Sequence, residues 1–235
     1  VGLVSGYALA NVDMVDITVR GRGGHGAYPH TTIDPVVLSS RLVLDFQTLV
    51  SRETSPLEPA VLTVGSIHGG TKGNVIPDEV KMELTLRSYT DEVRAALIEN
   101  IRRVCRGVAL SAGVPEADWP VVTVRDEFTP ALRNDPALTE RVEQTLRSAL
   151  GADRVVAVSP VMGGEDFGRF GRTDPAVPIC LFWLGAAAPA RVKASLDGGA
   201  VLPSLHSPRF TPDYAPAIET GTEAFTAAAL DLLSN

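Results

Sequence analysis

Two histidines stand in sequence settings where an imidazole could meet a ligand. His25 lies within the glycine-rich residues 21–26 and has no apolar neighbour, so we expect it to face a ligand rather than the core. The alternative is that these glycines form only a flexible connector. His206 lies in a polar loop ahead of a helical stretch, where it could be a metal ligand or a structural side chain. Because an imidazole can donate a hydrogen bond, move a proton or bind a metal, both are candidates for a site.

Three further polar residues could bind a substrate or support such a site. Asn74 lies in a short extended stretch between two turns, where it could satisfy the turn backbone or present its amide to a substrate carbonyl or carboxylate. Arg87 lies on the outward face of a predicted strand, where it could be solvated or bind a carboxylate with its planar fork. Glu165 follows two glycines and could begin a helix, where the macrodipole favours acids, or take part in a site.

Two other histidines and one glycine pattern are weaker candidates for a functional site. His30 could cap or orient the loop that follows His25, and His68 ends a predicted strand with either role open. Residues 21–26 formally match GxGxxG after a strand, but the next helix should begin only at Asp34 rather than at the third glycine. We therefore reject a dinucleotide-binding interpretation.

Alternating and helical apolar patterns show which elements must position these residues. Strands are expected at 12–20, 60–68, 79–89 and 121–124, and the third has the cleanest alternation of apolar and polar side chains. Helices are expected from Asp34 to about Arg52, with Val36, Val43, Val50, Leu42, Phe46 and Leu49 as its apolar stripe, and from a Thr90 cap to Gly113. The order β-α-β-β-α-β predicts a ferredoxin-like unit with two helices on one sheet face.

The remaining sequence has a different character from about residue 127. We expect a helix at 136–150, short strands near 154–158 and 178–184, and a closing helix at about 214–233. The stripe of that last helix would be Ile218, Phe225, Ala229 and Leu232. Two strands and two helices do not make a self-contained doubly wound sheet, so this part is expected to be half of an α/β domain.

The composition narrows the classes of partner. Hydrophobic residues make up 45% and charged residues 21%, as in an ordinary globular protein, and the net charge of −7 disfavours nucleic acid. No run approaches the roughly 20 apolar residues of a membrane span. Cys105 and Cys180 lie far apart in apolar settings and are expected to be buried thiols. With no signal peptide apparent, a cytoplasmic location is expected.

Four motifs in one order resemble a known family. They are GGHGAYPH at 23–30, VGSIHGGTKGNVIPDEV at 64–80, MGGEDF at 162–167 and LHSPRF at 205–210. Together they resemble the hippurate hydrolase and auxin-conjugate amidohydrolase branch of the aminoacylase/carboxypeptidase metallopeptidase family. The resemblance extends over essentially the whole sequence.

The resemblance implies an organisation in domains. Residues 1–11 would end an N-terminal segment of the catalytic domain, 12–126 would be a ferredoxin-like lid that also forms a homodimer, and 127–235 would be the C-terminal part of the catalytic domain. The family's other metal-ligand motifs, an HxCGHD-like stretch, a Glu-Glu pair and a further His, have no counterpart in this sequence. We therefore expect the N-terminal half of the catalytic domain to be missing and the isolated chain to be inactive.

The resemblance also implies roles for the candidate residues. His206 would bind a metal, and His25 would polarise the scissile carbonyl in the partner subunit's active site. Asn74 would bind the substrate, Arg87 its carboxylate, and Glu165 would support the site through a neighbouring group. The cofactors would be two divalent ions, with Zn favoured and Mn, Co or Ni compatible. Substrates would be N-acyl amino acids, such as hippurate-like compounds, or small peptides. The alternative function is a non-catalytic dimerisation or binding module that lacks the metal half.

Overall fold

The structure is a computed structural model that describes residues 1–234, and it divides into two compact units. The sheet unit comprises Leu9–Leu132 and Val161–Pro175. The terminal unit comprises Val1–Ala8, Arg133–Pro160 and the residues from Ala176 onward. Both mix helices and strands, so the molecule has a mixed α+β fold. None of the helices in residues 1–234 is long and apolar enough to cross a membrane.

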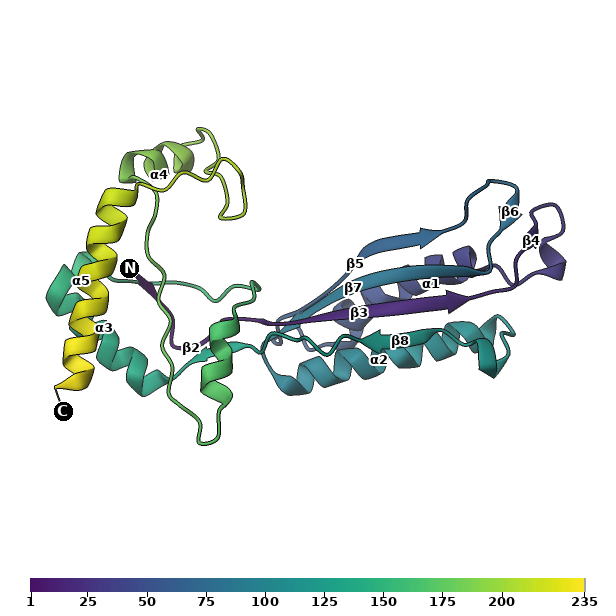
Figure 1. Cartoon of the computed structure of the whole chain (residues 1–235), viewed down its shortest axis with the longest axis horizontal. Coiled ribbons are helices and arrows are strands. Elements are labelled where there is room, and N and C mark those ends of the chain that lie inside the picture. The colour runs from purple at the N-terminus through teal and green to yellow at the C-terminus, as the bar shows by residue number, and fades with distance from the viewer. Residues whose placement is uncertain (235) are drawn as a thin grey trace. The chain divides into compact units, whose positions relative to one another are not determined.

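The sheet unit has the predicted β-α-β-β-α-β order, and its two helices lie on one face of the sheet (Figure 1). Its main strands pair in the order β5-β7-β3-β8, and all three pairings are antiparallel. The elements are, in chain order, β3 (Asn11–Arg20), α1 (Pro35–Thr48), β5 (Ala60–Gly69), β7 (Glu79–Ser88), α2 (Asp91–Ser111) and β8 (Val121–Val124). The helical path of α1 continues as a π-helix over Leu49–Glu53.

The core of the sheet unit lies between the sheet and these two helices. Alternate residues of β3 and β7 are buried there, as their period-2 pattern predicts. The face of α1 that meets them is formed by Leu38, Leu42 and Phe46. The predicted stripe was therefore partly wrong. Val36 is two residues before Leu38, which turns its side chain about 200° round the helix from that of Leu38, and it is 44% exposed.

Helix α2 begins and ends where its sequence signals predict. The Thr90 hydroxyl accepts the Val93 N–H at 3.2 Å, and Gly113 adopts a φ of +69°, which favours glycine just after a helix. Leu97, Ile101 and Cys105 face the core. Burial raises the pKa of the Cys105 thiol to about 12, so this cysteine is a packed thiol, as expected.

The opposite face of the sheet is polar and carries ion pairs. Arg125 donates to both carboxylate oxygens of Asp16, at 2.8 and 2.7 Å, and also approaches Glu83 at 3.8 Å. The hydrogen bonds from Arg125 hold the pKa of Asp16 below its usual value. The two helices, both predicted on the other side of the sheet, leave this face partly exposed.

The terminal unit has a smaller core. Helices α3 (Pro136–Leu150) and α5 (Tyr214–Leu233) pack against each other, and α4 (Pro189–Leu196) is a short helix that the sequence did not predict. The buried cluster consists of Leu3, Val142, Leu146, Leu150, Val155 and Ala224. Strand β1 (Gly2–Leu3) pairs in parallel with β10 (Val156–Ala157), which is all that forms of the strand expected near 154–158.

The strand expected at 178–184 was wrong. This segment forms only an isolated bridge between Gly2 and Trp183. Its backbone bonds partly to other backbone groups, because Gly2 and Trp183 exchange two hydrogen bonds and the Asp135 N–H donates to the Ile179 carbonyl. Between these contacts, the buried Asn134 amide donates to the Leu181 carbonyl at 2.9 Å and accepts the Leu181 N–H at 2.7 Å, where a strand ladder would have supplied a neighbouring backbone.

The stripe predicted for the closing helix was also wrong. Helix α5 spans the predicted residues, but it buries Gly221, Ala224 and Ala228. Ile218 and Phe225 remain 65% and 67% exposed. The large apolar residues do recur at helical spacing, but the residue that joins the buried cluster with α3 is the small Ala224.

Candidate functional site

A two-stranded sheet at one end of the sheet unit brings His25 and Asn74 together. Strand β4 (Gly24–His25) pairs with β6 (Val75–Ile76), with His25 opposite Val75. The Gly26 N–H donates to the Asn74 carbonyl at 2.8 Å, which fixes the two loops to each other. Both side chains are exposed. Two candidates that are almost fifty residues apart in sequence therefore share one surface, which we call the tip.

The glycines before His25 are required by close packing of backbone on backbone. A Cβ on Gly23 would lie 2.6 Å from the Ile76 carbonyl oxygen, and one on Gly21 would lie 2.4 Å from that of Ile33. Only glycine permits such an approach. The helix begins at Pro35, capped by Asp34, which matches the late helix start predicted from the sequence. These glycines therefore build the tip and do not lead directly into a helix.

The His25 ring is oriented by a local hydrogen bond. The Ala27 N–H donates to Nδ1 of His25 at 3.0 Å, so Nδ1 acts as an acceptor. In the neutral ring this places the proton on Nε2, which can then donate to a ligand. The Tyr28 ring lies 5.6 Å from the His25 ring and limits its movement on one side. The arrangement suits a hydrogen-bond donor aimed at an oxygen atom.

A hollow of about 460 Å³ lies beside the tip. It is lined by the glycine-rich loop 69–73 and by β6, together with Gly26, Asp34, Val36 and Pro77. Lys72 provides a positive charge in this loop, and its carbonyl accepts the Val75 N–H at 3.2 Å. His25 and Asn74 do not line this hollow, but their sequence neighbours Gly26, Gly73 and Val75 do, and its lining carries one cation, Lys72, and one acid, Asp34.

Arg87 lies at the opposite end of β7 from the tip and is only partly exposed. Its Nη1 donates to the carbonyl of Met162 at 2.8 Å. The guanidinium has five N–H donors, so this contact leaves others that could meet a carboxylate. The structure does not place Arg87 beside His25, because Arg87 pairs with Val12 near the start of β3, whereas His25 follows the end of β3.

Glu165 caps a short 3₁₀ helix, Asp166–Arg172. Its Oε1 accepts the Phe167 N–H at 3.3 Å, which is the helix-start geometry considered from the sequence. The preceding residues lie along β3, because the Ala10 N–H donates to the Gly163 carbonyl at 2.8 Å. Glu165 thus has a local structural role, and its partly exposed carboxylate keeps other lone pairs available.

His206 belongs to the terminal unit, whereas the other four candidates belong to the sheet unit. It is exposed in the loop between α4 and α5. Of the remaining histidines, His30 lies in a 3₁₀ turn (Pro29–Thr31) near Tyr28, and His68 is exposed at the end of β5. In residues 1–234 no three His, Cys, Asp or Glu side chains are grouped so that they could hold a metal ion.

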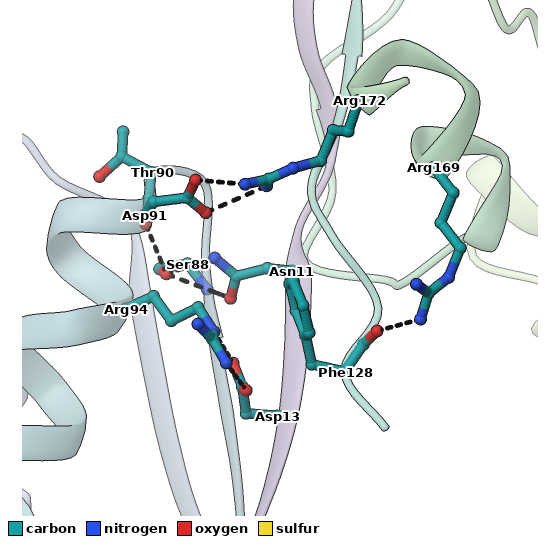
Figure 2. A network of polar contacts seen from close by, with 9 residues as sticks. All are labelled: Asn11, Asp13, Ser88, Thr90, Asp91, Arg94, Phe128, Arg169 and Arg172. Carbon is teal, nitrogen blue, oxygen red and sulfur yellow. Dashed lines mark hydrogen bonds and ion pairs between the residues drawn. The ribbon is translucent and has the colours of Figure 1, made fainter. Parts of the chain in front are cut away.

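Sequence reasoning did not identify a polar network at the base of the sheet unit (Figure 2). Asp13 is completely buried and accepts two hydrogen bonds from Arg94, at 2.7 and 2.6 Å. Its position on the same face as the apolar Val15 and Ile17 was the signal that could have revealed a buried carboxylate in need of a partner.

The protein family is indicated by comparison with known sequences. Residues 7–112 match the model of a peptidase dimerisation domain. A thermostable carboxypeptidase of Saccharolobus solfataricus is 35% identical over 180 residues, which cover 77% of this chain and 43% of the relative. An N-acetyldiaminopimelate deacetylase of Limosilactobacillus fermentum is 33% identical over 226 residues, covering 96% and 53%. An IAA-amino acid hydrolase of Arabidopsis thaliana is 37% identical over 173 residues, covering 73% and 38%.

A solved structure gives the same indication. It is a dinuclear metal-binding peptidase of the M20 family from Bacillus subtilis, 25% identical, with a TM-score of 0.73. The match covers 99% of this chain and 53% of that one. The chain spans about half the length, or less, of the relatives it matches.

Proposed function

Because this chain belongs to the M20 peptidase family, of which it carries the dimerisation domain and a C-terminal part, we propose that it works in a metal-dependent amidohydrolase. The substrates would be N-acylated amino acids, with hippurate-like compounds as the first choice. In support, the matched deacetylase and IAA-amino acid hydrolase are named for cleavage of acylated amino acids. The observation that carries the proposal is the tip, where one small sheet places His25 next to Asn74.

His25 would stabilise the oxyanion that forms when the amide carbonyl is attacked. Its Nδ1 already accepts the Ala27 N–H, so Nε2 would donate to the developing negative charge. The tip is an exposed surface, so it would act on a substrate held elsewhere. We propose that it enters the active site of a partner subunit in a homodimer formed through the ferredoxin-like lid, residues 12–126.

Asn74 and Arg87 would bind the substrate. The Asn74 carbonyl accepts the Gly26 N–H, which holds the Asn74 backbone next to the residue that follows His25. Its exposed side-chain amide would meet the same carbonyl as His25 or the adjacent carboxylate. The Arg87 guanidinium retains donors beyond its bond to Met162 and suits a carboxylate in a bidentate geometry. Since Arg87 is distant in register from His25, the two residues would serve different bound groups or different subunits.

His206 would supply one ligand to a pair of divalent ions, with Zn favoured and Mn, Co or Ni compatible. Such a pair would activate the attacking water. A metal site needs three or four protein ligands per ion, and the described part of the chain does not group that many. The chain alone therefore does not fit a two-metal site. We accordingly expect the isolated chain to be inactive, with the remaining ligands coming from another part of the catalytic domain. Glu165 would contribute indirectly, by holding another group of this metal site in position.

Two alternative functions are peptide cleavage and non-catalytic dimerisation. Cleavage of small peptides is suggested by the matched carboxypeptidase, and the same oxyanion donor would serve a peptide bond. A non-catalytic dimerisation module is suggested by the match of residues 7–112 to a dimerisation domain. In that case the tip would bind a ligand without turnover.

The decisive experiment replaces His25 in the complete gene product that contains this chain. His25→Ala is expected to lower kcat on an N-acyl amino acid by about 10²- to 10³-fold, as loss of one oxyanion donor does. His68→Ala is the matched control, because His68 is also an exposed histidine of the sheet unit but lies outside the tip. It should leave kcat within about twofold.

Three outcomes would contradict this function. Near-normal turnover by His25→Ala would remove His25 from the mechanism. Undiminished hydrolysis after thorough chelation would exclude the metal-dependent reaction. A complete product without activity on N-acyl amino acids and peptides would favour the non-catalytic module.

Mixed dimers of His25→Ala with a metal-ligand variant would test the partner-subunit arrangement. In such a dimer, the metal site of the His25→Ala subunit would receive an intact His25 from its partner, so one working active site should be regained.

A further inference from the structure

Residues 161–175 are held on the sheet unit, although a stretch of the terminal unit separates them from it in sequence. Leu9 bridges to Val161, and the Ala10 N–H donates to the Gly163 carbonyl at 2.8 Å. A Cβ on Gly164 would lie 2.4 Å from a methyl carbon of Val12, so this glycine permits close packing on β3. The MGGEDF motif therefore lies along the base of β3.

Two arginines from the 3₁₀ helix hold the other end of this segment. Arg169 donates to the carbonyl of Phe128, and Arg172 donates two hydrogen bonds to the carboxylate of Asp91 at the start of α2 (Figure 2). The Arg172 hydrogen bonds hold the pKa of Asp91 below its usual value. Between these contacts, a Cβ on Gly168 would lie 2.9 Å from the Ala131 carbonyl oxygen, so the helix backbone also packs closely.

The surface that receives these arginines is itself fixed. Arg94 forms its paired hydrogen bonds with buried Asp13, and its guanidinium lies 4.2 Å from the centre of the Phe128 ring. On the same side, the Asn11 side chain and Ser88 exchange hydrogen bonds of 2.8 to 3.2 Å. The Ser88 hydroxyl also donates to the carbonyl of Thr90, the residue before Asp91, at 3.3 Å. Phe128 is thus linked to buried Asp13 through Arg94, and the start of α2 is linked to buried Asn11 through Ser88.

We propose that Arg169 and Arg172 are positioning residues that fix the MGGEDF motif to the sheet unit, so that Glu165 acts from that unit and not from the terminal unit. The contribution of Glu165 to turnover rests on the proposed function, whereas the fixing of the segment does not. The proposal therefore has two parts that can be tested separately.

The first test measures hydrogen–deuterium exchange across residues 161–175. Arg172→Met and Asp91→Asn should each raise exchange in this segment by about two- to fivefold, the range expected for loss of an exposed ion pair. Their effects should not add in the double variant, because both remove the same contact. Arg172→Lys keeps the charge without the paired geometry and should fall between wild type and Arg172→Met.

Arg106→Met is the matched control for these variants. Arg106 is a residue of α2 and forms an exposed ion pair with Glu99 of the same helix, at 3.1 Å. Its side chain is 51% exposed, against 46% for Arg172. It should leave exchange in residues 161–175 unchanged. Unchanged exchange in Arg172→Met as well, or equal increases along the whole chain, would overturn the proposed fixing of the segment.

The second test uses the complete gene product and separates kcat from KM. Arg172→Met should lower kcat by about three- to tenfold with KM within about twofold, and Arg172→Lys should recover part of the loss. Raised exchange with normal kcat would overturn the role of the motif's position in turnover. An inactive wild-type product would contradict the proposed function, while the exchange measurement would still decide whether the arginines fix the segment.

Discussion

Helices α2 and α5 both carry apolar residues at helical spacing, but these residues are buried in α2 and largely exposed in α5. In the sheet unit, α2 packs its stripe against β7 and α1, and Leu97, Ile101 and Cys105 are almost completely buried. In the terminal unit, α5 packs its small residues on α3 and leaves Ile218 and Phe225 exposed beside Leu184 and Tyr214.

The difference teaches that periodicity predicts which face of a helix is apolar but not whether that face is covered. Burial depends on a second element with a complementary surface. The sheet provides such a surface for α2, because every second residue of the long strands β3 and β7 is buried on the helix side. Within the terminal unit, α5 buries only Gly221, Ala224 and Ala228, of which Ala224 joins the cluster that includes Val142 and Leu146 of α3, while Gly221 faces Leu184.

The largest effect should come from truncation in the core of the sheet unit. Phe46→Ala is expected to lower the free energy of unfolding of this unit by about 3 to 5 kcal/mol, because Phe46 is fully buried and a cavity would remain. The chain has two tryptophans, and Trp119 lies in the sheet unit while Trp183 lies in the terminal unit. Urea unfolding followed by fluorescence in a Trp183→Phe background would report the sheet unit alone. A loss below 1 kcal/mol would contradict the assigned core.

A charge substitution on one strand should distinguish its two faces. Asp13→Asn is expected to cost about 3 kcal/mol, because it breaks a pair in which the carboxylate is fully buried. Asp16→Asn is the matched control on the same strand, since its partner Arg125 lies on the exposed face, and it should cost less than about 1 kcal/mol. Equal losses in urea unfolding would show that the two faces do not differ as described.

The buried thiol of α2 should make the sheet unit sensitive to alkali. Burial raises the pKa of Cys105 from 9.0 to about 12, so the unfolded chain loses this proton at a lower pH than the folded one. Stability contributed by this group is therefore complete below pH 9 and falls as the pH rises from 9 towards 12. Unfolding measured from pH 7 to 11 should show a smaller alkaline loss in Cys105→Val. An identical loss would contradict the burial of this thiol.

The smallest effect should come from the exposed row of α5. Ile218→Ser is expected to change the free energy of unfolding of the terminal unit by no more than about 0.5 kcal/mol, because the side chain is mostly exposed and the two residues have similar helix propensities. Leu146→Ala on α3, where the side chain is fully buried, should cost about 2 to 5 kcal/mol. Trp183 fluorescence in a Trp119→Phe background would measure both. Similar losses would mean that Ile218 is covered.

In the candidate site, too, some features could be predicted from neighbouring residues and others depend on contacts between distant segments. The sequence proposed His25, Asn74 and Glu165 as candidates from their local settings. The pairing of β4 with β6, which joins two of these residues at the tip, depends on contacts between segments fifty residues apart. The hydrogen bond from Arg87 to the Met162 carbonyl could not be predicted either, because the local pattern around Arg87 does not indicate which distant segment it contacts.

The sequence by itself determined the order of strands and helices in the sheet unit, the ends of α2, the position of α5 and the family motifs. These features depend on residues within a few positions of one another, through side-chain alternation, capping and backbone freedom. Only the tertiary structure decided that residues 161–175 join the sheet unit, that Asp13 pairs with Arg94, and that the apolar row of α5 stays uncovered. Those outcomes depend on which distant surfaces meet, and a single sequence pattern carries no signal for the partner of each surface.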